Sequence, residues 1–236
     1  MRKFGLKRGL ALMMLGLGIA TGATVAGPAR PAYAQGVSEL EILVERARVT
    51  AMSLLNDPQY ANLVSLMKRA RAVLILPNVI QAGFFLGGGG GTGVLVARGD
   101  DGNWSGPAFY TMAEASFGLQ FGGQASQMMI VIMTQKGLDA VIDRKFKLGA
   151  DANVAIGEIG TAVGAAYGVG LSADMYVYAK SSGLFGGAAV EGSVVAPRQE
   201  WNDTFYGQKT TPRGILVDRQ FYRPEAQALA SVLTVQ

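Results

Sequence analysis

The residue types that carry most enzyme chemistry are missing from this sequence. The chain contains neither histidine nor cysteine, which excludes Ser-His-Asp catalysis, imidazole bases, thiol nucleophiles and the commonest zinc ligands. Carboxylate pairs, lysine bases and oxygen-ligated metals remain open. The acidic residues show no tight constellation along the chain: Glu114, Asp139, Asp143, Glu158, Asp174 and Glu191. We therefore expect a protein that is not an enzyme and that uses no cofactor and no metal.

A run of glycines, Gly87–Gly91, is the most distinctive stretch of the chain. A GxGxxG spacing can be matched at Gly88, Gly90 and Gly93, but a phosphate-binding loop should open a helix or place Lys-Ser/Thr after its last glycine. Here the run leads into the β-prone segment Val94–Val96. Because glycine lets backbones approach closely, the run predicts a bent pair of strands rather than a nucleotide site.

Two short groups of basic residues are the candidates for binding an anionic lipid. Phosphate headgroups need cationic donors near apolar side chains that enter the interface, and each basic residue near an anionic surface contributes about 1 kcal/mol. A solvated face, or a helix end whose dipole the cations complement, would have the same composition. The candidate residues are Lys68, Arg69 and Arg71, before the glycine run, and Arg144, Lys145, Phe146 and Lys147.

Amphipathic helices are predicted before and after the glycine-rich centre. Ser38 and Glu41 have capping-box spacing at the start of a helix over 38–55, whose apolar residues recur at helical intervals. Asp57 followed by Pro58 predicts the start of a second helix. Pro224 predicts the start of a closing helix, with Leu229 and Leu233 on one face.

The central part of the chain reads mostly as strands. Residues 99–103 form a turn between the segments 94–98 and 104–110, which predicts a hairpin. Residues 127–134 are short and almost wholly apolar, as in a strand buried on both faces, and 136–144 resembles one short helix. Residues 152–179 have overlapping GxxxG spacing, but their glycines and acidic residues favour glycine-punctuated strands over a membrane span.

The first 34 residues have the pattern of a secretory signal. Four basic residues precede an apolar stretch over 10–26, and Ala32-Tyr33-Ala34 provides an A-x-A cleavage site before Gln35. A retained membrane anchor is the alternative. Removing the five basic residues of this segment from the chain's 21 leaves 16 against 17 acidic ones. The remaining 35–236 would form a single domain close to neutrality, for which we expect no nucleic-acid partner.

Short motifs along most of this domain resemble the SYLF domain, a lipid-binding module that in fungi and animals is often joined to an SH3 domain. Their order and spacing carry the resemblance. The matching stretches are Ala82-Gly83-Phe84, Gly90-Gly91-Thr92-Gly93, Val96-Ala97-Arg98, Asp101-Gly102-Asn103-Trp104-Ser105, Pro107, Phe117-Gly118, Gln120, Val154-Ala155-Ile156-Gly157, Tyr178, Lys180, Gly183-Leu184-Phe185-Gly186, Val190-Glu191-Gly192-Ser193 and Phe205-Tyr206.

The resemblance implies an α+β domain with a glycine-rich antiparallel β core, barrel-like or sandwiched, flanked by N- and C-terminal amphipathic helices. It also implies phosphoinositide or phospholipid binding and, in fungal relatives, actin association. The sequence departs from the family where Gly89 stands in place of an arginine and Thr161 in place of a basic residue. Both departures reduce the charge available for headgroup recognition.

Two classes of function remain open. The chain is either a peripheral phospholipid-binding domain at the membrane surface of the cell envelope, or a structural or protein-interaction domain of the periplasm or outer envelope that kept the fold without the lipid site. Actin and phosphoinositides do not suit a chain exported by a bacterial-type signal. An outer-membrane barrel would agree with the signal and the glycine-rich strands, but at least three amphipathic helices count against it.

Export predicts a defined mature N-terminus. If the signal is cleaved after Ala34, mass spectrometry of the protein recovered from the periplasm or outer envelope should find a chain that begins at Gln35, with or without cyclisation of that residue. Recovery of the intact chain with Met1 from the cytoplasmic fraction would contradict export.

Overall fold

A computed structural model describes residues 32–83, 86–117, 122–143, 145–151, 154–156, 173–181 and 192–235. By backbone contacts the chain divides into two units, Met1–Pro31 and Ala32–Gln236. The predicted secretory signal therefore lies almost wholly outside the described residues. So do Arg144, Thr161 and the glycine motif over 183–191.

Helices stand before, between and after the strands of the second unit. In chain order the helices are α1 (Ala32–Leu55), η1 (Pro58–Tyr60), α2 (Ala61–Met67), α3 (Gln135–Asp143), α4 (Gln199–Tyr206), α5 (Pro212–Leu216), η3 (Pro224–Ala226) and α6 (Gln227–Leu233). The strands are β1 (Ala72–Gly83), β2 (Leu86–Ala97), β3 (Ala108–Phe117), β4 (Gly122–Ile132), β5 (Phe146–Lys147), β6 (Val154–Ile156), β7 (Met175–Ser181) and β8 (Val194–Pro197).

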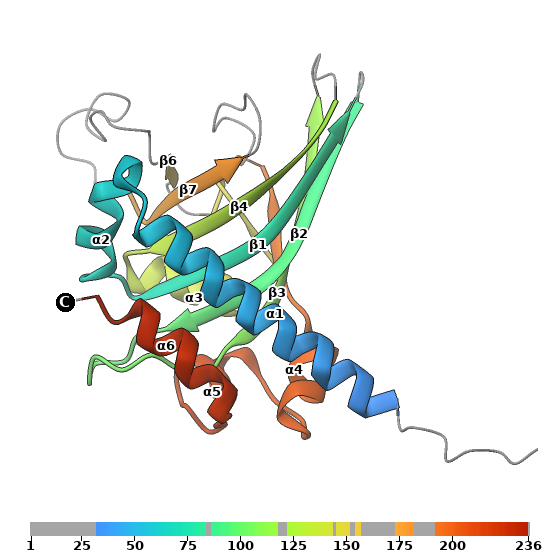
Figure 1. The fold of residues 1–236 in the computed structure, drawn as a ribbon, viewed down its shortest axis with the longest axis vertical. Coiled ribbons are helices and arrows are strands. Elements are labelled where there is room, and N and C mark those ends of the chain that lie inside the picture. The colour runs from blue at the N-terminus through green and yellow to red at the C-terminus, as the bar shows by residue number, and fades with distance from the viewer. Residues whose placement is uncertain are drawn as a thin grey trace, which may run out of the picture. The chain divides into compact units, whose positions relative to one another are not determined.

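The strands form one curved sheet in the order β5-β8-β3-β2-β1-β4-β7-β6 (Figure 1). Along this order, each strand pairs antiparallel with the next, except that the last strand, β6, pairs parallel with β7. This half-barrel with flanking helices confirms the predicted α+β class and the antiparallel, glycine-rich core. The predicted hairpin is confirmed as well, because β2 pairs with β3 and Arg98 bridges to Trp104 beyond the strand ends.

The sheet carries helices on both faces. Side chains alternate between the faces of a strand, and the neighbours Phe109 and Tyr110 of β3 show what covers each one. Phe109 stacks edge-on against Trp201 and Phe205 of α4, with ring centroids 6.3 and 5.1 Å apart. The Tyr110 hydroxyl instead lies 3.4 Å from the Val141 carbonyl of α3. Helix α1 crosses the sheet and packs along α6 and α4, so these three share the face opposite α3 (Figure 1).

Glycines on β2 let it approach β1 more closely than side chains would allow. The β1–β2 register shifts between Ile75 and Asn78, where β1 contains Pro77, as expected of a bulge. A Cβ atom on Gly91 would lie 2.5 Å from the Asn78 carbonyl oxygen, and one on Gly93 would collide with the Ile75 carbonyl. The glycine run thus shapes the sheet, as its sequence context predicted.

The helix starts differ from their predictions in two places. Helix α1 begins at Ala32 rather than at Ser38, so the capping-box prediction is wrong: a Ser-x-x-Glu spacing also occurs inside a helix when preceding residues continue it. Asp57 does accept a hydrogen bond from the Gln59 amide at 3.1 Å. The turn it caps is the 3₁₀ helix η1, and α2 follows directly.

An ion pair and an aromatic pair fasten the start of α2 to strand β7. The Lys180 Nζ lies 2.7 Å from the Asp57 carboxylate, and the Tyr60 hydroxyl donates to the Ala179 carbonyl at 2.7 Å. Tyr60 also stacks edge-on with Tyr178. The sequence places Lys180 and Glu191 on segments that flank the loop 183–186, at a separation that suits a cross-strand ion pair; Glu191 lies outside the described residues, so this pair stays a prediction.

The close approach of β1 and β2 predicts that Gly93→Ala destabilises the fold. The added methyl group would collide with the Ile75 carbonyl, and relieving that contact requires a shift of the paired backbone. We expect the free energy of unfolding to fall by about 2 kcal/mol or more, measured by urea denaturation. Thr92→Ala, at the half-buried neighbouring position, is the control and should cost less than about 1 kcal/mol. Equal stability of the two variants would refute this account of the glycine run.

Candidate functional site

The described residues offer no metal centre and no bilayer-spanning helix. Among them, no three acidic side chains gather closely enough to hold a metal ion. Their helices also fall short of the length and hydropathy that a membrane span requires.

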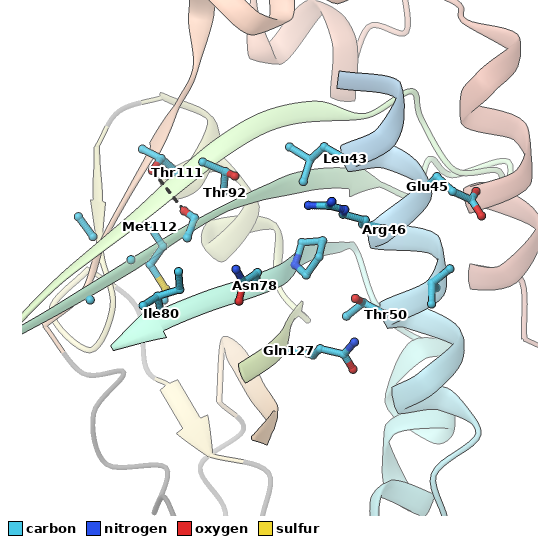
Figure 2. A pocket seen from close by; sticks show the side chains of 16 residues that line it. Leu43, Glu45, Arg46, Thr50, Asn78, Ile80, Thr92, Thr111, Met112 and Gln127 are labelled. Carbon is cyan, nitrogen blue, oxygen red and sulfur yellow. Dashed lines mark hydrogen bonds between the residues drawn. The ribbon is translucent and has the colours of Figure 1, made fainter. Parts of the chain in front are cut away.

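A groove of about 780 Å³ lies between α1 and the sheet (Figure 2). This volume is in the range of small-molecule sites, about 300–1,000 Å³. Helix α1 forms one wall, and strands β1 to β4 form the floor and the other wall. The lining side chains from the helix include Leu43, Arg46, Val49 and Thr50, and those from the sheet include Asn78, Ile80, Thr92, Thr111, Met112 and Gln127.

Glycines form the floor of the groove. Gly89, Gly90 and Gly91 of β2 line it and are partly exposed. A Cβ on Gly89 would lie 2.8 Å from both the Ile80 carbonyl oxygen and the Gln81 Cγ. A larger residue at this position would require the Gln81 side chain and the Ile80 carbonyl to move.

Arg46 is the cation of the groove. Its guanidinium reaches from α1 over the sheet, whereas the Glu45 carboxylate points away (Figure 2). Glu45 is held by Arg48, with nitrogen–oxygen distances of 2.8 and 2.6 Å, and this hydrogen bonding lowers the pKa of the Glu45 carboxyl. Within the described residues Arg46 has no ion pair of its own. The groove therefore presents an uncompensated positive charge beside apolar walls.

The first predicted basic group lies at the turn between α2 and β1. Lys68, Arg69 and Arg71 are all exposed. Arg71 pairs with Asp100 at 3.1 Å, where both side chains are open to solvent, so this pair contributes little stability. Lys68 and Arg69 form no ion pair within the described part of the chain. This group keeps most of its charge available.

Arg98 adds a fourth cation to this group, which the sequence alone did not indicate. Its guanidinium donates to the Lys68 carbonyl at 2.8 Å and stacks over the Trp104 ring at 4.6 Å from the centroid. Desolvation lowers the pKa of Arg98 below that of a free arginine, but the side chain stays charged at neutral pH. The predicted hairpin places residues 98 and 104 opposite each other, so it could have indicated the stacking of Arg98 on Trp104. It gave no signal for the contact of Arg98 with Lys68. We call Lys68, Arg69, Arg71 and Arg98 the basic turn.

The second predicted basic group is only partly at the surface. Lys145 and Lys147 are exposed, whereas Phe146 is 1% exposed and pairs opposite Val195 of β8. Its predicted insertion into a membrane does not agree with this burial, since the ring already belongs to the core. The alternation of lysine, phenylalanine and lysine is the period of a strand with one buried face.

The two basic groups lie apart in the sheet. Strands β8, β3 and β2 separate β5 from β1. Lys147 nevertheless lies on the same face of the sheet as the groove. One row of paired residues crosses the neighbouring strands from Lys147 through Val194, Ala113 and Gly90 to Ile80. The basic turn lies before the start of β1, and Arg71 is about 30 Å from Ile80 along the chain at about 3.3 Å per residue.

Fold and site together define an α+β binding domain with separate cationic and apolar surfaces and no catalytic constellation among the described residues. Residues 113–236 match the family Ysc84, described as Las17-binding protein actin regulator. The match covers more than half of the chain, and the chain belongs to this family of non-catalytic binding domains. The resemblance to the SYLF domain is thereby confirmed at the level of the family.

Curated relatives support the same assignment. The chain is 35% identical over 171 residues to Protein YSC84 of Saccharomyces cerevisiae. This alignment covers 71% of this chain and 36% of that protein. It is 31% identical over 194 residues to the human SH3 domain-containing YSC84-like protein 1, covering 82% of this chain and 56% of the relative. The matched region thus spans about a third to a half of these relatives.

The burial of Phe146 predicts a structural effect of its removal. Phe146→Ala should lower the free energy of unfolding by about 3–5 kcal/mol, the usual cost of deleting a buried aromatic side chain. Lys145→Ala, at the exposed neighbouring position, should change it by less than about 0.5 kcal/mol. Chemical denaturation of both variants measures the difference. Unchanged stability of Phe146→Ala, combined with weaker vesicle binding, would restore the residue to the surface role that the sequence suggested.

Proposed function

We propose that the protein is a non-enzymatic domain that binds anionic phospholipid at a membrane surface through the basic turn. The observation that carries this proposal is the unbalanced charge there. Four cations gather at the α2–β1 turn, and Asp100 is the one carboxylate that pairs with them among the described residues. Each exposed cation contributes about 1 kcal/mol near an anionic leaflet. The attachment is therefore weak and reversible.

We place this membrane in the cell envelope. The support is the n-region, apolar stretch and A-x-A site of the first 34 residues, which predict export and release after Ala34. Las17 and actin appear in the description of the family, but an exported chain would not meet them. The proposed ligand is therefore an anionic phospholipid of the envelope.

Protein binding is the second candidate function. The family is described by a protein partner, and helix α1 exposes three large apolar side chains, Ile42, Val49 and Met52. Exposed aliphatic side chains on one helix can serve a partner helix or groove as well as a lipid interface. A partner in the envelope would use this surface without needing the basic turn.

Vesicle sedimentation separates the two functions. Lys68→Gln combined with Arg69→Gln should reduce binding to phosphatidylglycerol vesicles several-fold at low salt. The difference from the parent should shrink at high salt, where screening has already removed the charge contribution. Lys136→Gln combined with Lys209→Gln removes two exposed charges elsewhere and is the matched control.

Three outcomes are decisive. Loss of binding in the basic-turn variant alone supports the proposal. Equal loss in both double variants would mean that net charge, not this site, drives attachment. A parent protein that does not sediment with vesicles of any anionic content would leave protein binding as the function.

Lys145→Gln combined with Lys147→Gln tests the second basic group in the same assay. We expect a smaller loss of vesicle binding, because the buried Phe146 side chain cannot insert into the membrane there.

A further inference from the structure

The groove between α1 and the sheet has chemistry that surface attachment does not use. It lies at the other end of β1 from the basic turn, and its one cation, Arg46, comes from α1. The Arg46 guanidinium has no carboxylate partner among the described residues, because its neighbour Glu45 is already bound by Arg48. A guanidinium that lines a groove without an anion favours a ligand that brings one.

Exposed aliphatic side chains line the groove on both the helix and the sheet. Val49 on the helix is 48% exposed, and Ile80 on the sheet is 55% exposed. Both belong among the few large hydrophobic side chains that stay exposed in the described structure. Covering apolar surface of this kind removes it from water, which favours binding. A ligand with an aliphatic part would gain this contribution from both walls.

The floor leaves room for an extended chain. Gly89–Gly91 present backbone without side chains, and Ala113 of β3 adds one methyl group beside them. Asn78 and Ile80 stand on the same face of β1, about 7 Å apart along the strand. An elongated ligand can therefore place a polar end near Arg46 and Asn78 and run its tail past Ile80 over the glycines (Figure 2).

We propose that this groove binds one molecule of a single-chain anionic amphiphile, an oxyacid head on an aliphatic tail. The guanidinium of Arg46 binds the head, and the Asn78 and Gln127 amides stand on the same lining for further hydrogen bonds. A fatty-acid carboxylate and a lysophospholipid phosphate share this chemistry. The site is distinct from the basic turn and does not depend on membrane attachment.

Fluorescence titration of the purified protein with 11-(dansylamino)undecanoic acid, below its micellar concentration, tests the proposal. Arg46→Gln should weaken binding about tenfold through the head, equivalent to about 1.4 kcal/mol. Ala113→Leu, at an exposed position, should weaken it by filling the floor. The methyl ester of the probe, which lacks the charge, should bind the parent about as weakly as the acid binds Arg46→Gln.

The control variant is Lys68→Gln combined with Arg69→Gln, which should bind the probe like the parent. The two assays therefore test the two sites separately. Vesicle binding by this variant tests the basic turn, and probe binding by the groove variants tests the groove. Displacement of the probe by dodecanoate assigns a carboxylate ligand, and displacement by monomeric lysophosphatidylglycerol assigns a phosphate one. Parent-like binding by both Arg46→Gln and Ala113→Leu, or loss of binding in the basic-turn variant, overturns the proposal.

Discussion

The close approach of strands β1 and β2 is the constraint on which the rest of the structure depends. The carbonyl oxygens of Ile75 and Asn78 occupy the space that side chains would need at Gly93 and Gly91, so this backbone path requires glycine. The register shift beside Pro77 belongs to the same distortion. It lies in the central pair of an eight-stranded sheet, and that sheet is curved (Figure 1). Glycines of the same run form the floor of the groove, which links the stability of the fold to the shape of the groove.

The two proposed binding sites use cations in separate parts of this frame. The basic turn collects Lys68, Arg69, Arg71 and Arg98 where α2, β1 and the β2–β3 hairpin meet. Arg46 stands alone over the groove. A planar anionic surface suits the first arrangement, because Lys68, Arg69 and Arg71 are exposed at one turn, whereas a single amphiphile suits the second, because one cation lines a groove together with apolar side chains. A membrane domain with both could hold a bilayer and sample single lipids from it.

Much of the fold follows from local patterns, and the sites mostly do not. The glycine run, the turn over 99–103 and the apolar segment of β4 specify their strands through turn chemistry and composition. Helices α4 and α5 were not predicted: they are short, and Trp201 and Phe205 are apolar because they cover Phe109 of β3. Likewise, Arg98 joins the basic turn through its hydrogen bond to the Lys68 carbonyl, 30 residues away in the chain, and the groove exists because α1 lies across the sheet. Such positions depend on tertiary contacts that a single sequence does not display.

Hydrogen–deuterium exchange on phosphatidylglycerol vesicles tests the central claim most directly, because it maps the attached surface without any substitution. The account predicts slower exchange of backbone amides over 68–71 and 98–104, which form the basic turn and its hairpin. It predicts unchanged exchange over 199–216, on α4 and α5. Protection confined to 199–216, or no protection at all while the protein is bound, would contradict attachment through the basic turn.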